Sequence, residues 1–208
     1  MIQCATIFTD HMLLQRGKPL AVFGTGTPGE TVTVSIPERR CAVSSAVSTD
    51  GTWRVTLPPM PGGTGCTMTV NETVFTDVAF GEVWLAGGQS NMEFMLKDAK
   101  NGAAELERCG NSNVRYFQVP RNTFVDAAYT AALDAAHWEL PSPEVCGTWS
   151  AVAYLAAKEL AEHLGVPVGI IGCNFGGSSI SCWLPEKDLQ AHAAGHGYLQ
   201  DYADATAG

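Results

Sequence analysis

The spacing of apolar residues changes near residue 78, and this change limits the fold more than any other feature of the sequence. Before it, the segments TVTVSI (31–36) and TWRVTL (52–57) alternate polar and apolar side chains, as half-buried β-strands do. Asp50 and Gly51 fit a tight turn that joins 41–49 to 52–57 as a hairpin, because glycine tolerates a positive φ. No helical period occurs there, so we predict a small antiparallel β-sandwich over residues 1–78.

After residue 78 the pattern becomes that of an α/β domain. EVWLA (82–86) and VPVGIIG (166–172) are continuous apolar runs, as buried parallel strands are. Between them, Ser150 precedes a helical pattern that ends at Gly165. The expected apolar face of this helix consists of Val152, Leu155, Ala156, Leu160 and Leu164. The order strand, helix, strand predicts a parallel sheet with flanking helices over residues 79–208.

The composition narrows the classes of partner and site. Twelve basic and 21 acidic side chains give the 208 residues a net charge of −9, which repels nucleic acid and anionic membrane surfaces. No apolar run is long enough to span a membrane, and the N-terminus lacks the pattern of a signal peptide. Seven cysteines lie singly, so we expect free thiols in a reducing compartment, the cytoplasm, and no structural zinc site. We interpret Cys173 and Cys182, which flank a glycine-rich loop, as structural.

Ser90 is the residue on which a functional assignment depends. It lies in GEVWLAGGQSNMEF (81–94), directly after an apolar strand, two glycines and Gln89. With Glu93 it forms the pattern of a capping box, so one interpretation is that Ser90 only begins a helix. The other is that Ser90 is a nucleophile, because a serine on a strand-to-helix turn is exposed. A second glycine-rich loop (174–179) follows another strand, and both loops belong at the carboxyl edge of the sheet, where ligands bind.

A nucleophilic Ser90 needs hydrogen-bond donors for the charge that develops on the substrate oxygen. Its own backbone N–H is one candidate. Gly176 or Gly177 offers another, because a residue without a side chain lets a substrate approach the backbone closely. The side-chain amide of Asn174 is a further candidate, or else Asn174 is a turn residue. No segment has metal-ligand spacing, so we expect no metal and no cofactor.

Together with IFTDHMLLQRGKPLAVFG (7–24) and WSAVAYLAAKELAEHLGVPVGIIGCNFGGSSISCWLP (149–185), the GQSNM block resembles the sialate O-acetylesterase branch of the SGNH (GDSL-like) hydrolases. The resemblance covers nearly the whole chain in the right order. It implies deacetylation, the removal of O-acetyl groups from sugars such as acetylated sialic acids, with Ser90 as the nucleophile. It also implies oxyanion or substrate contacts from residues around Ser90 and in the second loop, namely Gln89, Asn91, Asn174, Gly176, Gly177 and Trp183.

The sequence departs from this family after Trp183. Members carry a later block resembling W-x-Q-G-E and an Asp-x-x-His pair that activates the serine, and neither follows here. Asp134 and His137 do form an Asp-x-x-His, but before the second loop, so we interpret this pair as incidental. His192 and His196 are interpreted as exposed residues of a helical tail.

We therefore expect the N-terminal portion of a carbohydrate esterase that is inactive alone and whose unfinished sheet favours self-association. The alternatives are a non-catalytic, carbohydrate-binding relative and an esterase that acts on xylan-type acetyl esters.

Overall fold

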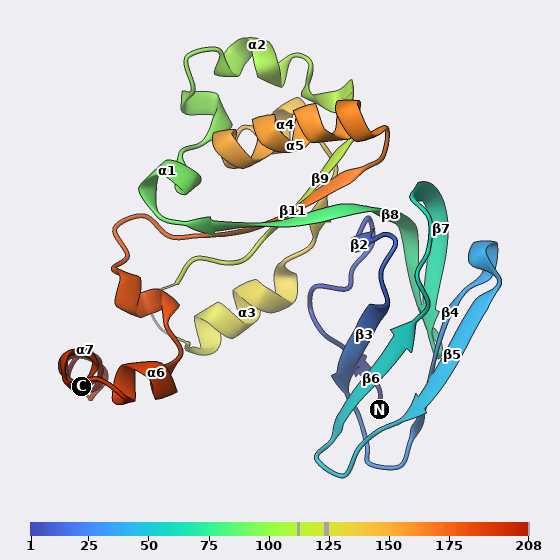
Figure 1. Cartoon of the computed structure of the whole chain (residues 1–208), viewed down its shortest axis with the longest axis horizontal. Coiled ribbons are helices and arrows are strands. Elements are labelled where there is room, and N and C mark those ends of the chain that lie inside the picture. Colours follow the sequence, from blue (N-terminus) through green and yellow to red (C-terminus); the bar gives the residue numbers. More distant parts are fainter. Residues whose placement is uncertain (112, 123–124, 208) are drawn as a thin grey trace.

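The computed structural model describes residues 1–111, 113–122 and 125–207 and shows two β-sheets, with helices gathered around one end of the larger sheet (Figure 1). The smaller sheet has the strand order β1-β3-β6, and the larger has the order β10-β9-β11-β8-β7-β4-β5, with β2 beside β8. The strands are β1 (Gln3–Cys4), β2 (Leu13–Gln15), β3 (Leu20–Thr25), β4 (Thr31–Ile36), β5 (Cys41–Ala46), β6 (Thr52–Leu57), β7 (Gly63–Val70), β8 (Thr73–Gly88), β9 (Val114–Gln118), β10 (Trp138–Glu139) and β11 (Val168–Asn174). The helices are α1 (Ser90–Glu93), α2 (Gly102–Leu106), α3 (Ala127–Ala135), α4 (Pro143–Cys146), α5 (Ala151–Leu164), α6 (Glu186–Gln190) and α7 (Ala193–Thr206), with the 3-10 turns η1 (Pro37–Arg39), η2 (Leu96–Asp98), η3 (Cys109–Asn111) and η4 (Ile180–Trp183).

The N-terminal strands form the predicted antiparallel β-sandwich. The small sheet packs against β4, β5, β7 and the first part of β8, and one apolar cluster fills the space between them. In β6 the side chains of Trp53, Val55 and Leu57 are buried, while the residues between them are exposed. The alternation seen in the sequence therefore reports the two faces of a half-buried strand.

The hairpin predicted around Asp50 and Gly51 is wrong, although the turn itself is present. Gly51 has a φ of 80°, and the N–H of Ser48 donates to the carbonyl of Thr52 at 2.8 Å. However, β5 pairs with β4, and β6 pairs with β3. The turn therefore carries the chain from one sheet of the sandwich to the other, because turn residues specify a reversal of direction but not which strands then pair.

The C-terminal half has the predicted α/β arrangement, in a mixed sheet. β8, β11 and β9 run parallel, and β10 adds an antiparallel edge. Helices α1, α2, α4 and α5 lie on one side of these strands and α3 on the other (Figure 1). The predicted burial of the EVWLA run is wrong at Trp84 and Leu85, which are 52% and 69% exposed. From Trp84 to Gly88, β8 has a strand partner on one side only within the described residues, so its outer edge is uncovered.

The helix α5 begins and ends as predicted, but it buries a different face. The Ser150 hydroxyl accepts the N–H of Ala153 at 3.2 Å, and Gly165 ends the helix with a φ of 64°. The buried residues are Ala151, Ala153, Tyr154, Ala157 and Ala161, whereas Val152, Leu155 and Leu164 are exposed. Alanine lets the helix backbone approach the strands closely. The helix therefore buries its alanine-rich face and not the face with the larger aliphatic side chains.

Arg115, on β9, ties the α/β strands to the sandwich. Its side chain is buried, and its Nη1 donates to the backbone carbonyls of His11, at 2.8 Å, and of Asp77. Its Nη2 donates to the Asp77 carboxylate at 3.0 Å, and the other oxygen of that carboxylate lies 2.8 Å from Nδ1 of His11. Burial by itself raises the pKa of Asp77, but the hydrogen bond with His11 and the charge of Arg115 outweigh it, so the pKa is lowered.

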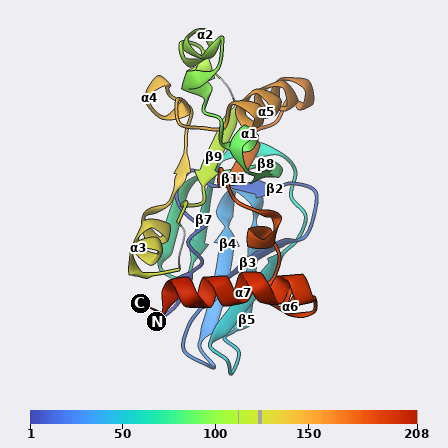
Figure 2. The same ribbon diagram turned by 90° about the vertical axis from the view of Figure 1, so that its left-hand side faces the viewer.

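The boundary between residues 78 and 79 falls inside β8, which belongs to both halves of the large sheet. We retain 1–78 and 79–208 as a proposed division, because the hydrophobic cluster beneath α5 draws only on residues after position 78. The cluster of the sandwich crosses the boundary, since Ala79, Phe80, Phe117 and Trp138 belong to it. The chain closes with α6 and α7, which lie away from both sheets (Figures 1 and 2). Among the described residues, no helix has both the length and the apolar character needed to cross a bilayer.

We predict that Arg115→Met lowers the free energy of unfolding by about 3 kcal/mol, because it leaves buried carbonyl groups and a carboxylate without their partner. The control is Arg54→Met, since Arg54 is exposed on β6 and its replacement should cost less than about 0.5 kcal/mol.

The lowered pKa of Asp77 stabilises the fold at pH values above the pKa of an aspartate in the unfolded chain, about 3.9. The difference between wild type and Arg115→Met should therefore shrink as pH falls below about 4 in urea titrations. If Arg115→Met were as stable as Arg54→Met, Arg115 would not tie the α/β strands to the sandwich.

Candidate active site

The two glycine-rich loops lie side by side at the carboxyl ends of β8 and β11. The strands are in register to their last residues, where Gly88 is opposite Asn174. The N–H of Phe175 donates to the carbonyl of Gly88 at 3.0 Å, which holds the starts of the two loops together. A Cβ added to Gly176 would lie 3.8 Å from the Cα of Ser90. The structure therefore brings the residues of both loops to one place.

Ser90 is the first residue of the one-turn helix α1, and it does not cap it. The residue before it, Gln89, occupies the cap position, and its side-chain oxygen accepts the backbone N–H of Ser90 at 2.8 Å. The same oxygen accepts the Ser90 hydroxyl. The predicted capping box of Ser90 with Glu93 is therefore wrong, because the carboxylate of Glu93 binds the other loop. The hydroxyl of Ser90, an exposed residue, therefore does not cap the helix.

The surroundings of Ser90 are open. It lines a depression of about 330 Å³ with Glu93, Phe94, Met95, Asp98 and Gly176, and a second one with its neighbours from Gly88 to Met92, among them the exposed Asn91. No histidine of the described residues lines either depression. His137, expected to be incidental, is exposed, with Nδ1 3.0 Å from the carbonyl oxygen of Ala135. A histidine base for Ser90 is therefore not among its neighbours in the described part of the chain, where the ionisable side chains are the carboxylates of Glu93 and Asp98.

The predicted backbone donors have different surroundings. The N–H of Gly176 donates to the carboxylate of Glu93, so it is already engaged. The next residue, Gly177, has a φ of 79°, and a Cβ built on it would meet no atom within 4 Å. The backbone of Gly177 is therefore exposed to an approaching ligand, whereas Gly176 serves the contact between the loops.

Asn174 is part of the scaffold in this structure. It is only 3% exposed, and its Oδ1 accepts Nη2 of Arg121 at 3.0 Å and Nε at 3.2 Å. Nε of Arg121 also donates to the backbone carbonyl of Asn174 at 3.1 Å. The Nδ2 group of Asn174 is buried, so it faces no substrate beside Ser90.

Arg121 is the residue that the sequence did not reveal. It follows β9 by three residues and places its Nη1 3.5 Å from the Glu93 carboxylate, in addition to its bonds with Asn174. The signal that was available is its position, because β9 is the third parallel strand and its end lies at the same edge as those of β8 and β11. Arg121 thus links the loops that follow all three strands.

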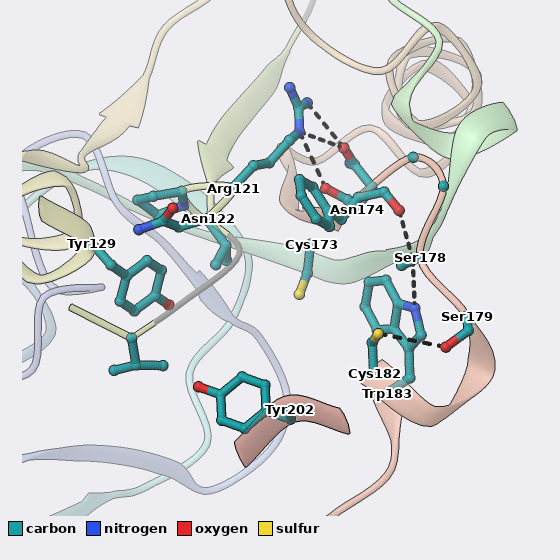
Figure 3. Close-up of a pocket in the computed structure, with 16 residues that line it drawn as sticks. Arg121, Asn122, Tyr129, Cys173, Asn174, Ser178, Ser179, Cys182, Trp183 and Tyr202 are labelled. Atoms are coloured by element: carbon teal, nitrogen blue, oxygen red, sulfur yellow. Dashed lines mark hydrogen bonds between the residues drawn. The ribbon is translucent and has the colours of Figure 1, made fainter. Parts of the chain in front are cut away.

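A larger cavity of about 760 Å³ lies on the other side of the second loop (Figure 3). Its wall includes both glycines of this loop, Gly176 and Gly177. In Figure 3, Tyr129 and Trp183 lie on opposite sides of it, with Cys173 between them. Trp183 is held by a hydrogen bond from its Nε1 to the hydroxyl of Ser178 at 2.9 Å. Aromatic faces with nearby polar groups are typical of a site for a small polar ring.

Comparisons with known proteins identify relatives of this chain. Residues 80–198 match the family model described as "Carbohydrate esterase, sialic acid-specific acetylesterase". The sialate O-acetylesterases of Pongo abelii and Homo sapiens are 34% and 33% identical to it in alignments of 207 positions that cover 90% of this chain and 39% of each relative. The crystal structure of a carbohydrate acetylesterase from Xanthomonas citri superposes with a TM-score of 0.80 at 30% identity, covering 94% of this chain and 45% of that one. The chain thus spans about two fifths of the length of these curated relatives.

We predict that Gly176→Ala destabilises the protein by about 1.5 kcal/mol, the low end for losing a hydrogen bond to a charged group. The added methyl group would lie 2.8 Å from Oε2 of Glu93, so the carboxylate must move away from the Gly176 N–H. The control is Gly197→Ala in α7, where the added Cβ meets nothing within 4 Å and helix propensity favours alanine. Urea titrations compare the two variants. A Gly176→Ala protein as stable as wild type would show that the contact with Glu93 contributes nothing.

Proposed function

The chain belongs to the sialic acid-specific acetylesterase family of carbohydrate esterases, and we propose that it carries the nucleophile of an enzyme that removes O-acetyl groups from sugars such as acetylated sialic acids. The observation that carries this proposal is the position of Ser90. Its hydroxyl is exposed at the carboxyl end of β8, beside a glycine loop that allows close approach of a substrate.

In the proposed reaction the Ser90 oxygen attacks the carbonyl carbon of the acetyl ester, and the sugar alcohol leaves as the acetyl group is transferred to Ser90. Water then hydrolyses the acetyl-enzyme. Before the attack, the Gln89 side chain must release the N–H and the hydroxyl of Ser90, because its oxygen holds both. The freed N–H is then a donor for the oxyanion. The side-chain amide oxygen of Gln89 is too weak a base to take the serine proton, so the base must come from elsewhere.

We assign the other predicted contacts in the same proposal. Gly177 is the better candidate for a second backbone donor, because the N–H of Gly176 is engaged with Glu93. Trp183 is proposed as a surface for the sugar ring, and Asn91 as a polar contact on the exposed side of Ser90. A role for Asn174 or Gly176 as an oxyanion donor requires the contacts with Arg121 or Glu93 to open.

A non-catalytic, carbohydrate-binding role is the second candidate. It is favoured by the lack of a histidine around Ser90 in the described residues and by the aromatic cavity beyond the second loop. An esterase that acts on xylan-type acetyl esters is an alternative of the same reaction class. Residual turnover that depends on Ser90 distinguishes the two esterases from each other by the acetylated sugar that they prefer. Binding of an acetylated sugar without any turnover that depends on Ser90 indicates the non-catalytic role.

We also propose a reducing compartment, the cytoplasm, for this chain. All seven cysteines are free thiols, and burial raises the pKa of Cys4 to about 11, which keeps it unreactive. The partner proposed for the uncovered edge of β8 is a second copy of the chain, because Trp84 and Leu85 are exposed on opposite faces of that edge.

We predict that the 208-residue chain hydrolyses p-nitrophenyl acetate and acetylated sialic acid at well under 1 s⁻¹, about the low end for working enzymes, because no histidine among the described residues lines the depression at Ser90. Any residual activity should vanish in Ser90→Ala and should survive excess chelator, since a serine mechanism needs no metal. Faster turnover would mean that one of the histidines acts as the base, and His137 would then be replaced first. Activity that chelation removes and added zinc restores would replace the serine mechanism with a metal-dependent one.

We predict that Leu85→Lys shifts the chain from oligomers to the mass of a single chain in light scattering, because a charge on an uncovered edge opposes strand pairing. Val74→Lys is the control, since Val74 is also an exposed apolar residue of β8 but lies in the part that pairs with β7. A wild-type chain that is monomeric at all concentrations, or a Leu85→Lys variant that still oligomerises, would contradict self-association through this edge.

A further inference from the structure

We propose that Glu93 and Arg121 are the positioning residues of the Ser90 site: together they set the distance between the helix that carries Ser90 and the loop that carries Gly176. The inference rests on the proposed function for its catalytic meaning. The contacts from which we argue it are all present in the structure without a substrate. Neither residue is proposed to touch the reacting atoms.

Glu93 reaches from one loop to the other. It lies three residues after Ser90, which places it on the same side of α1, and its Oε2 accepts the N–H of Gly176. It also lines the same depression as Ser90 and Gly176. Because Gly176 is a glycine, the carboxylate of Glu93 can come close to its backbone, where a Cβ would lie 2.8 Å from Oε2, and this bond holds the loop beside Ser90.

Arg121 fixes Glu93 and the second loop at once. Its Nη1 lies 3.5 Å from Oε1 of Glu93, while Nε and Nη2 bind the buried Asn174. Nη2 is also 3.4 Å from Oε1 of Gln118, at the end of β9. The guanidinium thus contacts one residue that follows β8 and the last residues of β11 and β9. Its planar fork of donors can make all of these contacts in one orientation, which a lysine cannot do.

The partial burial of this pair distinguishes it from an ordinary surface ion pair. The side chains of Arg121 and Glu93 are 23% and 29% exposed, and each also makes a hydrogen bond that holds it in place. Exposed ion pairs contribute little because they are solvated and mobile. Here both side chains are anchored at a second point, so the ion pair adds a geometric constraint on the two loops. In an active site, a shift of about 1 Å between such groups costs roughly 100-fold in rate.

The test is an NMR comparison of the 208-residue chain with variants at these two positions. In the wild type, the nuclear Overhauser contact between the α-protons of Ser90 and Gly176 reports their separation, and the hydrogen exchange of the Gly176 amide reports its bond to Glu93. In Glu93→Ala we expect the contact to disappear and the Gly176 amide to exchange about tenfold faster or more, as for loss of a charged hydrogen bond. Glu93→Gln keeps one acceptor oxygen for the Gly176 N–H but presents an NH₂ group in place of the oxygen that faces Arg121, so its exchange rate should lie between those of the wild type and Glu93→Ala.

Arg121→Lys should lose the contact as Glu93→Ala does, because lysine cannot bind Glu93 and Asn174 together. The matched control is Glu105→Ala, which removes a carboxylate paired with Lys158 and Arg108 far from the loops and should change neither readout. A Glu93→Ala or Arg121→Lys protein that keeps the wild-type contact and exchange rate would overturn the proposal. The proposed function fails on a different result, a Ser90→Ala protein that releases acetate as fast as the wild type, and that result would leave these readouts to decide the positioning role.

Discussion

The hydrogen bonding of β8 to strands on both of its sides is the interaction on which the rest of the structure depends. Its first part pairs antiparallel with β7 in the sandwich, and its last part pairs parallel with β11 in the α/β sheet. Gly81 lies at the change of partner, where a Cβ would meet the carbonyl oxygen of Pro167 at 1.9 Å. The absence of a side chain there lets the start of β11 approach β8. Because the same strand ends at Gly88, the sandwich, the parallel sheet and the position of Ser90 are all fixed by one register.

The parts of the fold that could be predicted are those set by local chemistry. Ser150 and Gly165 mark the ends of α5 because each satisfies a backbone requirement of the helix terminus. The partner of β6 was not predictable from Asp50 and Gly51, because both possible pairings use the same turn. The buried face of α5 was missed for a related reason. Its alanines allow close packing on β11, and a ranking by side-chain size gives the opposite face.

The candidate site shows the same division between local and tertiary information. The two glycine loops were predicted to lie at one edge of the sheet because both follow apolar strands, and Gly88 and Asn174 are indeed in register. The capping role of Gln89 was missed, since the sequence shows a serine three residues before a glutamate and capping statistics favour the serine. Arg121 was missed because nothing in its neighbourhood marks it. Its importance comes from contacts with residues more than 25 positions away in sequence, in loops that only the sheet brings together.

The oxygens around Ser90 occupy the backbone N–H groups that a substrate oxygen would otherwise bind. Ser90 and Gly176 are exposed, so water can also reach these donors, but in this structure acceptors of the chain serve them. Here the Gln89 oxygen accepts the Ser90 N–H and the Glu93 carboxylate accepts the Gly176 N–H, so both donors are satisfied within the chain. The two acceptors differ in how readily they release. Within the described residues, the exposed side chain of Gln89 is bonded only to Ser90, whereas the side chain of Glu93 is held by Arg121 as well. A substrate oxygen would therefore displace Gln89 first and leave Glu93 in place, so the same pair of loops can bind a ligand beside Ser90 without losing the contact that positions them.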